Sequence, residues 1–175
     1  MAIFPEIRDS PVAIGLLRIS PALITLTLVI NRVAQYYAFT SFLAPHISPS
    51  QHDAAPTLQL WFRRLAARIW GPVIALSLLQ TILCIVNVFV YPVPAEYGVA
   101  WWLHIWSLVL ANGHWPFVRT LLRYEHAVKD YRATPKQSLT ALEGWMATNN
   151  VRVLLVDVPQ AFVSAAAALA SATWV

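Results

Sequence analysis

The chain has 175 residues, of which 58% are hydrophobic and only 11% are charged, and its mean hydropathy is +0.58. Soluble domains carry about 25% charged residues, so this composition excludes an ordinary soluble globule and a disordered chain. The single cysteine, Cys84, excludes a disulfide framework and a cysteine-rich zinc site. The net charge of +4 resembles that of nucleic-acid-binding proteins, but the basic residues stand beside apolar segments. We therefore expect an integral membrane protein whose partners are lipid and a hydrophobic small molecule, not nucleic acid.

Four apolar segments are long enough to cross a bilayer, which takes about 20 residues. They cover approximately residues 11–39, 60–91, 99–122 and 140–172. A proline-rich polar loop is expected over 43–56, and Gly113 with Pro116 predicts a kink in the third segment. The predicted fold is all-α, an integral membrane four-helix bundle that forms a single transmembrane domain over residues 1–175.

The ends of the predicted helices are marked by polar and basic residues. The stretch 119–136 is expected to be a basic polar linker, and the fourth helix to begin near Ser138. Ser138 or Thr140 is the predicted cap, with Glu143 near the positive end of the helix. The lysines and arginines gather at the first and third loops: Arg63, Arg64, Arg68, Arg119, Arg123, Lys129, Arg132 and Lys136. The positive-inside rule therefore places both long loops in the cytosol and both termini on the opposite side.

Helix four carries polar residues where lipid is expected. Trp145, Asn149 and Arg152 share one face, and Asn150 and Asp157 lie seven residues apart on another. Asp157 falls about 18 Å deeper than Trp145, near the bilayer centre, at 1.5 Å per residue. A carboxylate there must pair with a cation, face water or stay protonated. The predicted catalytic residues are therefore Asp157, Arg152 and Asn149.

Polar residues on the other helices are expected to complete a pocket between the helices. Helix one offers Asn31 and Gln35 on one face, with Arg32 about 100° round, either in the pocket or reaching for the interface. The predicted substrate-binding residues are Asn31, Gln35, Asn112, His114, Trp145 and Asn150. The alternative left open is that these groups, including an Asp157–arginine pair, only bond helices together.

Metal and cofactor motifs are missing from the sequence. His104 and His114 are ten residues apart, which separates them by about 15 Å along a helix, so they cannot hold one ion. No histidine cluster at ligand spacing and no G-x-G-x-x-G segment occurs. We therefore expect no metal and no cofactor, and we expect general acid–base and electrostatic catalysis.

The W-x-x-x-N-x-x-R run at Trp145, Asn149 and Arg152, followed by an apolar final helix, resembles the anthrone oxygenase family of small four-helix membrane proteins. The segment HWPFVRTLLRYEH, residues 114–126, is a weaker match. The resemblance implies oxidation of polyketide anthrones to anthraquinones, with molecular oxygen as co-substrate and no cofactor, in the endoplasmic reticulum membrane. It implies that Asp157 or a histidine is the base, that Arg152 and Asn149 stabilise negative charge, and that Trp145 stacks on the substrate.

Two other classes of function stay open at this stage. A non-redox membrane cyclase, isomerase or epoxide hydrolase of natural-product biosynthesis would use the same polar pocket with paired acid and base groups. A non-catalytic structural or carrier protein would use the polar residues only for helix packing. The sequence fixes neither the substrate nor the oligomeric state.

Overall fold

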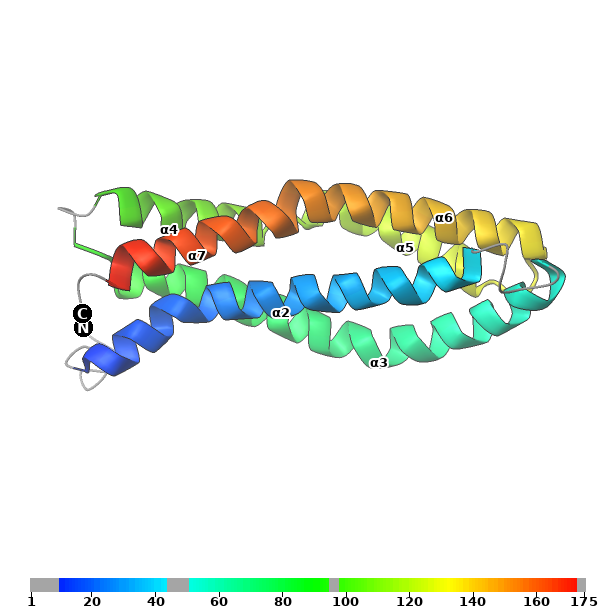
Figure 1. The fold of residues 1–175 in the computed structure, drawn as a ribbon, viewed down its shortest axis with the longest axis horizontal. Helices are drawn as coiled ribbons and strands as arrows, with labels where there is room; N and C mark the ends of the chain where they lie inside the picture. Colours follow the sequence, from blue (N-terminus) through cyan, green and yellow to red (C-terminus); the bar gives the residue numbers. More distant parts are fainter. Residues whose placement is uncertain (1–9, 44–50, 95–97, 173–175) are drawn as a thin grey trace. The chain divides into compact units, whose positions relative to one another are not determined.

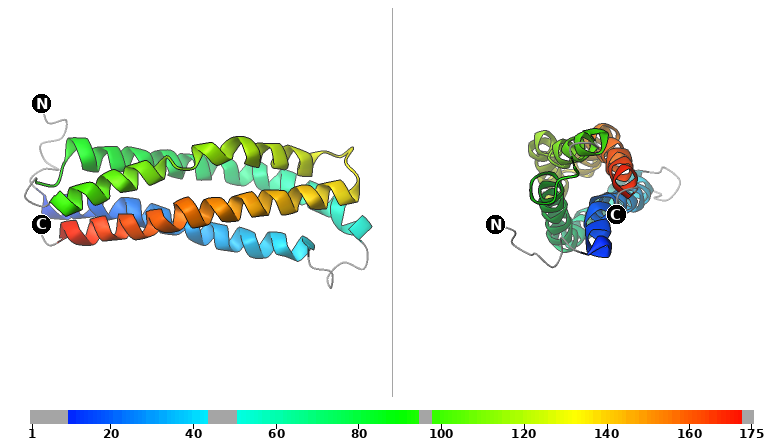
Figure 2. Two further views of the ribbon diagram at one scale, coloured as in Figure 1. Left: turned by 90° about the horizontal axis from the view of Figure 1, so that it is seen from above. Right: turned by 90° about the vertical axis from the view of Figure 1, so that its left-hand side faces the viewer.

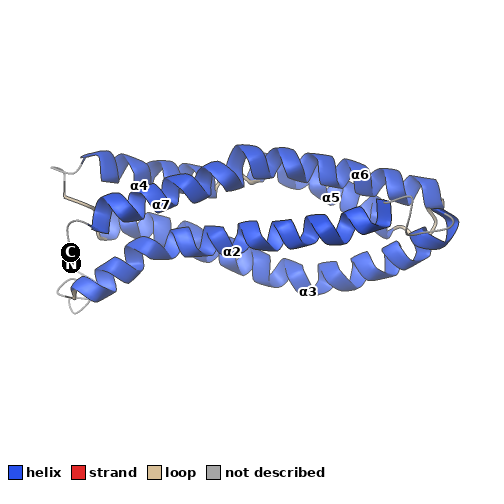
Figure 3. Cartoon of the chain, in the orientation of Figure 1, coloured by secondary structure: helices blue, strands red, loops and turns tan. Residues whose placement is uncertain are grey.

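The protein is described here by a computed structural model that covers residues 10–43, 51–94 and 98–172. Within these ranges every regular element is helical and no strand occurs (Figure 3). The elements in chain order (Figure 1) are α2 (Pro11–Leu43), α3 (Gln51–Ile85), η1 (Val86–Val90), α4 (Gly98–Ala111), α5 (Trp115–Lys129), α6 (Pro135–Arg152), η3 (Val153–Asp157) and α7 (Val158–Ala172). The predicted all-α class is confirmed.

Three helical stretches in the described residues are long and apolar enough to cross a membrane. They are Pro11–Leu43, Ala55–Val90 and Pro135–Ala172, and they correspond to the first, second and fourth apolar segments of the sequence. Many large apolar side chains on these helices are exposed, including Leu16, Phe89 and Phe162. An exposed apolar surface of this extent is unfavourable in water and is compatible with a membrane location.

The third apolar segment is divided into two helices, α4 and α5, by a turn over residues 112–114. Pro116 stands in the first turn of α5, where its missing N–H is tolerated. The kink predicted at Gly113 and Pro116 is thus a complete break. The expected polar linker over 119–136 is wrong, because α5 extends to Lys129. Its buried residues Leu121 and Val128 lie seven apart on one helical face, and that burial stabilises the helix.

The start of the fourth helical segment also differs from the prediction. Thr134 is the cap of α6, and it forms a capping box with Gln137: the Gln137 backbone N–H donates to Thr134 Oγ1 at 3.3 Å, and the Thr134 N–H donates to Gln137 Oε1 at 2.8 Å. Pro135 occupies the first turn, as its fixed φ favours. The predicted caps Ser138 and Thr140 are therefore wrong, because the box lies one turn earlier.

The loop expected over 43–56 is likewise shorter than predicted, because α3 already begins at Gln51. Pro56 lies near the start of this helix, where it forgoes a single intrahelical hydrogen bond. Residues 44–50, the rest of the expected loop, lie outside the described residues.

The π-helical turn η3 changes which residues of the last helical segment are buried. In a regular helix Asp157 would share the face of Asn150, because seven residues span almost two full turns. Asn150 is exposed, whereas Asp157 is only 4% exposed. A π-turn holds one residue more than an α-turn and so rotates the following helix. It therefore brings Asp157 onto the buried side.

The described residues group into two compact units, and α2 and α3 each contribute to both. Unit 1 comprises Met1–Val29, Ala75–Gly113 and Val156–Val175, and unit 2 comprises Ile30–Ile74 and His114–Leu155. In unit 1, α4 packs along α7, and in unit 2, α5 packs along α6 (Figures 1 and 2). The four-helix bundle and the single transmembrane domain over 1–175 stay predictions.

Candidate functional site

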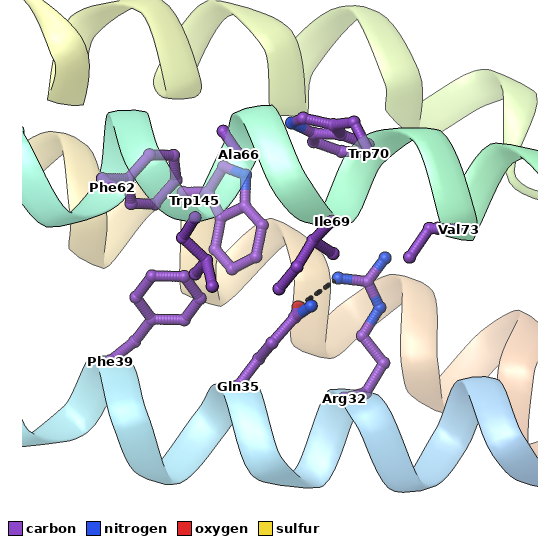
Figure 4. A pocket seen from close by; sticks show the side chains of 10 residues that line it. Arg32, Gln35, Phe39, Phe62, Ala66, Ile69, Trp70, Val73 and Trp145 are labelled. Atoms are coloured by element: carbon purple, nitrogen blue, oxygen red, sulfur yellow. Dashed lines mark hydrogen bonds between the residues drawn. The ribbon is translucent and has the colours of Figure 1, made fainter.

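Unit 2 contains a small cavity whose walls come from α2, α3 and α6 (Figure 4). Its lining residues are Arg32, Gln35, Phe39, Phe62, Leu65, Ala66, Ile69, Trp70, Val73 and Trp145. The cavity measures about 30 Å³. A buried water molecule needs about 10–15 Å³ of such space, so the cavity has room for about two waters.

The polar groups of this cavity are hydrogen-bond donors. Arg32 Nη1 donates to Gln35 Oε1 at 2.6 Å, and both side chains are buried (Figure 4). Because the Gln35 oxygen accepts this bond, its amide nitrogen is the group that remains to donate. The indole N–H of Trp145 is buried and has no hydrogen-bond partner among the described residues. The cavity thus combines a guanidinium, an amide and an indole N–H, and none of its lining residues is acidic or a histidine.

The walls of the cavity on the other side are aromatic. The ring centroid of Phe39 lies 5.0 Å from that of Trp145 and 5.3 Å from that of Phe62, and the centroids of Phe62 and Trp145 are 5.8 Å apart. Phe39 also meets Trp61 edge to face at 5.3 Å. Such pairs contribute about 0.5–1.5 kcal/mol each beyond their buried area. The rings therefore form a rigid apolar wall against which a flat molecule can stack.

The face of α6 that carries Trp145 bears two more predicted site residues, which do not line the cavity. Asn149 and Arg152 follow one and two turns later, and both are buried, as predicted from their shared face. Asn149 Oδ1 accepts no hydrogen bond from the described residues. The sequence pattern thus identified a buried polar stripe on α6, and the structure adds that Trp145 joins this stripe to the cavity.

The remaining predicted site residues do not line the cavity. Asn31 is half-buried on α2, and Asn150 is exposed on α6. Asn112 belongs to unit 1, and its side-chain amide donates to the Leu108 carbonyl of α4 at 2.9 Å. His114 is half-buried in the turn before α5, and Asp157, the last residue of η3, is buried and belongs to unit 1. Of the six predicted substrate-binding residues, the structure brings Gln35 and Trp145 to one cavity.

Unit 1 contains a buried polar network that the sequence analysis did not identify. Arg18 Nη1 donates to the Ser171 carbonyl at 3.1 Å, and His104 Nε2 lies 3.0 Å from Ser171 Oγ. The Ser171 hydroxyl donates to the Ala167 carbonyl at 2.7 Å. Ser171 Oγ thus contacts both the imidazole of His104 and the Ala167 carbonyl of its own helix. The network links α2, α4 and α7.

Further polar contacts within unit 1 join small side chains of neighbouring helices. Ser107 Oγ lies 2.7 Å from Ser164 Oγ and 3.4 Å from Cys84 Sγ. Gln80 donates to Thr25 Oγ1. The sequence signal for these contacts was the pair of serines at positions 164 and 171 of one apolar helix, because residues seven apart lie on the same helical face. These contacts are typical of hydrogen bonds that fix helix packing in membranes.

The end of unit 2 where α5 meets α6 is held by charged and amide groups. Gln59 Nε2 donates to Ser138 Oγ at 2.7 Å, and Arg63 Nε donates to the Lys129 carbonyl at 2.9 Å. Glu125 is buried and pairs with Lys129 one turn later. The Glu–Lys spacing of four was the sequence signal for this pair. In the described residues no three His, Cys, Asp or Glu side chains lie close enough to share a metal ion.

The fold and the cavity define the class: an all-helical, strongly apolar protein with membrane-length helices and a donor-rich cavity between aromatic walls. The chain is 34% identical over 148 residues, 84% of each sequence, to the oxaleimides biosynthesis cluster protein N of Penicillium oxalicum. The protein of the same name from P. oxalicum strain 114-2 / CGMCC 5302 gives the same identity and coverage. The chain therefore belongs to the family of oxaleimides biosynthesis cluster protein N. No model of a known protein family and no solved structure matches it, so the anthrone oxygenase resemblance is not confirmed.

Proposed function

We propose that this protein is an integral membrane enzyme of secondary metabolism that binds a hydrophobic, ketone-bearing polyketide at the cavity of unit 2. The observation that carries the proposal is the convergence of Arg32, Gln35 and the unpartnered Trp145 indole N–H beside an aromatic wall. N–H donors in a dry site stabilise an oxygen atom that gains negative charge during reaction. A relative named for a biosynthesis cluster supports a biosynthetic role.

The reaction we propose is the one that the anthrone oxygenase resemblance implies. The ketone oxygen of the substrate accepts hydrogen bonds from the three donors, which stabilises the enolate formed when the ring methylene loses a proton. Molecular oxygen, the co-substrate, then attacks that carbon. The methylene becomes a carbonyl by gaining one oxygen atom, and the second oxygen leaves with both methylene hydrogens as water. The chain's contribution is to orient the rings, hold the oxyanion and exclude water.

The lining of the cavity contains no carboxylate and no histidine that could act as the base for the first proton transfer. Asp157, the base expected from the sequence, belongs to unit 1, and the cavity belongs to unit 2. The cavity therefore supplies the oxyanion site in our proposal. The roles of Asp157 as base and of Arg152 and Asn149 in charge stabilisation stay predictions.

The cavity must open for a fused-ring substrate to enter. Ligand pockets measure about 300–1,000 Å³, an order of magnitude more than the present cavity. We propose that the substrate partitions into the bilayer and enters by displacing side chains between α2 and α3. Ile69, Trp70 and Val73 are the lining residues nearest the middle of the membrane-length stretch Ala55–Val90, and they are only partly buried.

The membrane and orientation follow from the same proposal. Unit 2 carries ten of the twelve lysines and arginines, and the positive-inside rule favours a cytosolic position for its loops. We propose the endoplasmic reticulum membrane, with both termini on its non-cytosolic side. An enzyme embedded there meets an apolar substrate directly in the lipid.

An acid–base cyclase, isomerase or epoxide hydrolase is the second candidate. It is favoured by the burial of Asp157 within a π-helical turn, because such turns are frequent at functional sites. Acid–base catalysis by a carboxyl group needs no oxidant.

The test uses the purified full chain in detergent with a panel of anthrones and epoxy-polyenes, and follows dissolved oxygen and product mass in the presence of a chelator. Trp145→Phe removes the indole N–H and keeps an aromatic ring. Loss of one oxyanion donor lowers turnover by about 10²–10³-fold. The matched control is Trp106→Phe, because Trp106 is exposed on α4, and it should leave oxygen uptake unchanged.

The outcomes separate the candidates. Oxygen uptake that falls in Trp145→Phe alone supports the proposal. A product isomeric with the substrate or heavier by one water, with oxygen constant, supports the acid–base enzyme instead. Saturable binding of substrate without any turnover would leave a carrier as the function.

A further inference from the structure

A groove on unit 2, between α5 and α6, shares no residue with the cavity described above. Its lining residues are Arg123, Tyr124, Ala127, Thr134, Lys136, Gln137, Thr140 and Ala141, and its volume is about 470 Å³. The groove is large enough for a headgroup-sized ligand. It lies where the third loop joins the two helices, which is the region that the positive-inside rule assigns to the cytosol.

The rim of the groove is cationic and rich in donors. Arg123 and Lys136 are exposed on its two sides, one from each helix, and Thr140 adds a hydroxyl group. No lining residue is acidic. The capping box turns Gln137 Oε1 toward the backbone N–H of Thr134, so the amide nitrogen of Gln137 is its remaining donor. This donor set suits an oxyanion such as a phosphate.

The floor of the groove is apolar. It is formed by Ala141, which is buried, and by the ring of Tyr124, which is half-buried, whereas the apolar lining residue Ala127 is exposed. The ring rests directly against Gly144, where an added Cβ atom would lie 2.6 Å from Tyr124 Cζ. A cationic rim above an apolar floor matches a molecule with a charged head and an apolar body, and matches free phosphate less well.

The charge of unit 2 points to the same ligand. Unit 2 contains ten basic residues (Lys and Arg) and four acidic residues (Asp and Glu), which gives a net charge of +6. Unit 1 contains two basic and four acidic residues, which gives a net charge of −2. The cytosolic leaflet carries anionic lipids, and basic pockets beside membrane helices bind their headgroups. We propose that the groove between α5 and α6 binds the phosphate headgroup of an anionic phospholipid. This inference rests on the proposed membrane location but not on the proposed reaction.

The experiment measures lipid binding to the full chain in a neutral detergent, without any substrate. Short-chain phosphatidic acid is titrated against the thermal unfolding of the protein, with phosphatidylcholine and inorganic phosphate as separate arms. Each cation near an anionic lipid adds roughly fivefold to the affinity, so the double variant Arg123→Gln, Lys136→Gln should bind about 30-fold more weakly. The control Arg64→Gln, Arg68→Gln removes two exposed charges of α3 and should keep the affinity.

Each outcome decides the inference. Stabilisation by phosphatidic acid alone, lost in the groove variant and kept in the α3 variant, supports it. Equal losses in both double variants would show that only net charge matters, and either that result or equal stabilisation by phosphatidylcholine, whose phosphate is neutralised by its choline group, would overturn the inference of an anionic-headgroup site. Inorganic phosphate acting as strongly as the lipid would assign the groove to a soluble phosphate ester instead. Failure here leaves the oxygen-uptake test untouched, because no substrate is involved.

Discussion

Substitution of Gly144 by alanine tests how closely α5 and α6 approach. An alanine Cβ at this position would lie 2.6 Å from Tyr124 Cζ and 3.0 Å from Cδ1. Real Cβ atoms do not come so near a neighbour, so the tyrosine ring or the helix must move. Overpacking of this kind costs about 1–3 kcal/mol. The same substitution in a helix without neighbours stabilises by about 0.5–1 kcal/mol, because alanine has the higher helix propensity.

The matched control is Gly15→Ala in α2, where an added Cβ atom meets nothing within 4 Å. Both variants gain the same helix propensity, so the difference between their free energies of unfolding isolates the steric cost at Gly144. We expect Gly15→Ala to raise the melting temperature and Gly144→Ala to lower it, by about 2–4 °C per kcal/mol in a chain of this size.

The assay is thermal unfolding of the full chain in detergent, and a third variant completes the argument. Gly144→Ala combined with Tyr124→Ala removes the ring that the new methyl group meets. The double variant should therefore be more stable than the sum of the single effects, with a coupling of about 1–3 kcal/mol. If Gly144→Ala stabilises as much as Gly15→Ala, the close contact between α5 and α6 does not exist and the geometry of the groove floor is wrong.

Two further predictions concern caps and buried polar groups, and both are read from the same unfolding assay. Thr134→Ala should destabilise by about 1 kcal/mol through loss of the capping box, whereas Thr140→Ala, exposed nearly two turns further along α6, should change the stability by less than about 0.5 kcal/mol. Equal effects would contradict the observed start of α6. Ser171→Ala should cost about 1–2 kcal/mol, because the buried Nε2 of His104 loses its hydrogen-bond partner, and the exposed control Ser41→Ala should be neutral. A neutral Ser171→Ala would show that His104 is satisfied without this bond.

Composition and periodicity determined most of the helical segments. Three of the four apolar segments appear as membrane-length helices, because a run of about 20 apolar residues can satisfy its backbone only within itself. The buried face of α6 was also readable, since Trp145, Asn149 and Arg152 recur at the spacing of one helical face. Local physics of this kind needs no knowledge of what a helix packs against.

The starts and breaks of the helices were readable only in part. The residues of the capping box, Thr134 and Gln137, stand in the sequence at the required spacing, but Ser138 and Thr140 offered a competing cap one turn later. The sequence predicted a kink, but the chain forms two separate helices, because a proline such as Pro116 is also favoured in the first turn of a new helix.

Only the tertiary structure decided which polar residues meet. Gln35 and Trp145 were two of six residues expected in one pocket, and no local pattern separated these two from the four that do not line the cavity. The π-turn η3 places Asp157 on the buried side, although a regular repeat puts it beside exposed Asn150. Burial of Ser171 under His104 likewise depends on α4 lying along α7. Sequence periodicity fixes the faces of a single helix, whereas contacts between helices depend on packing that local rules do not contain.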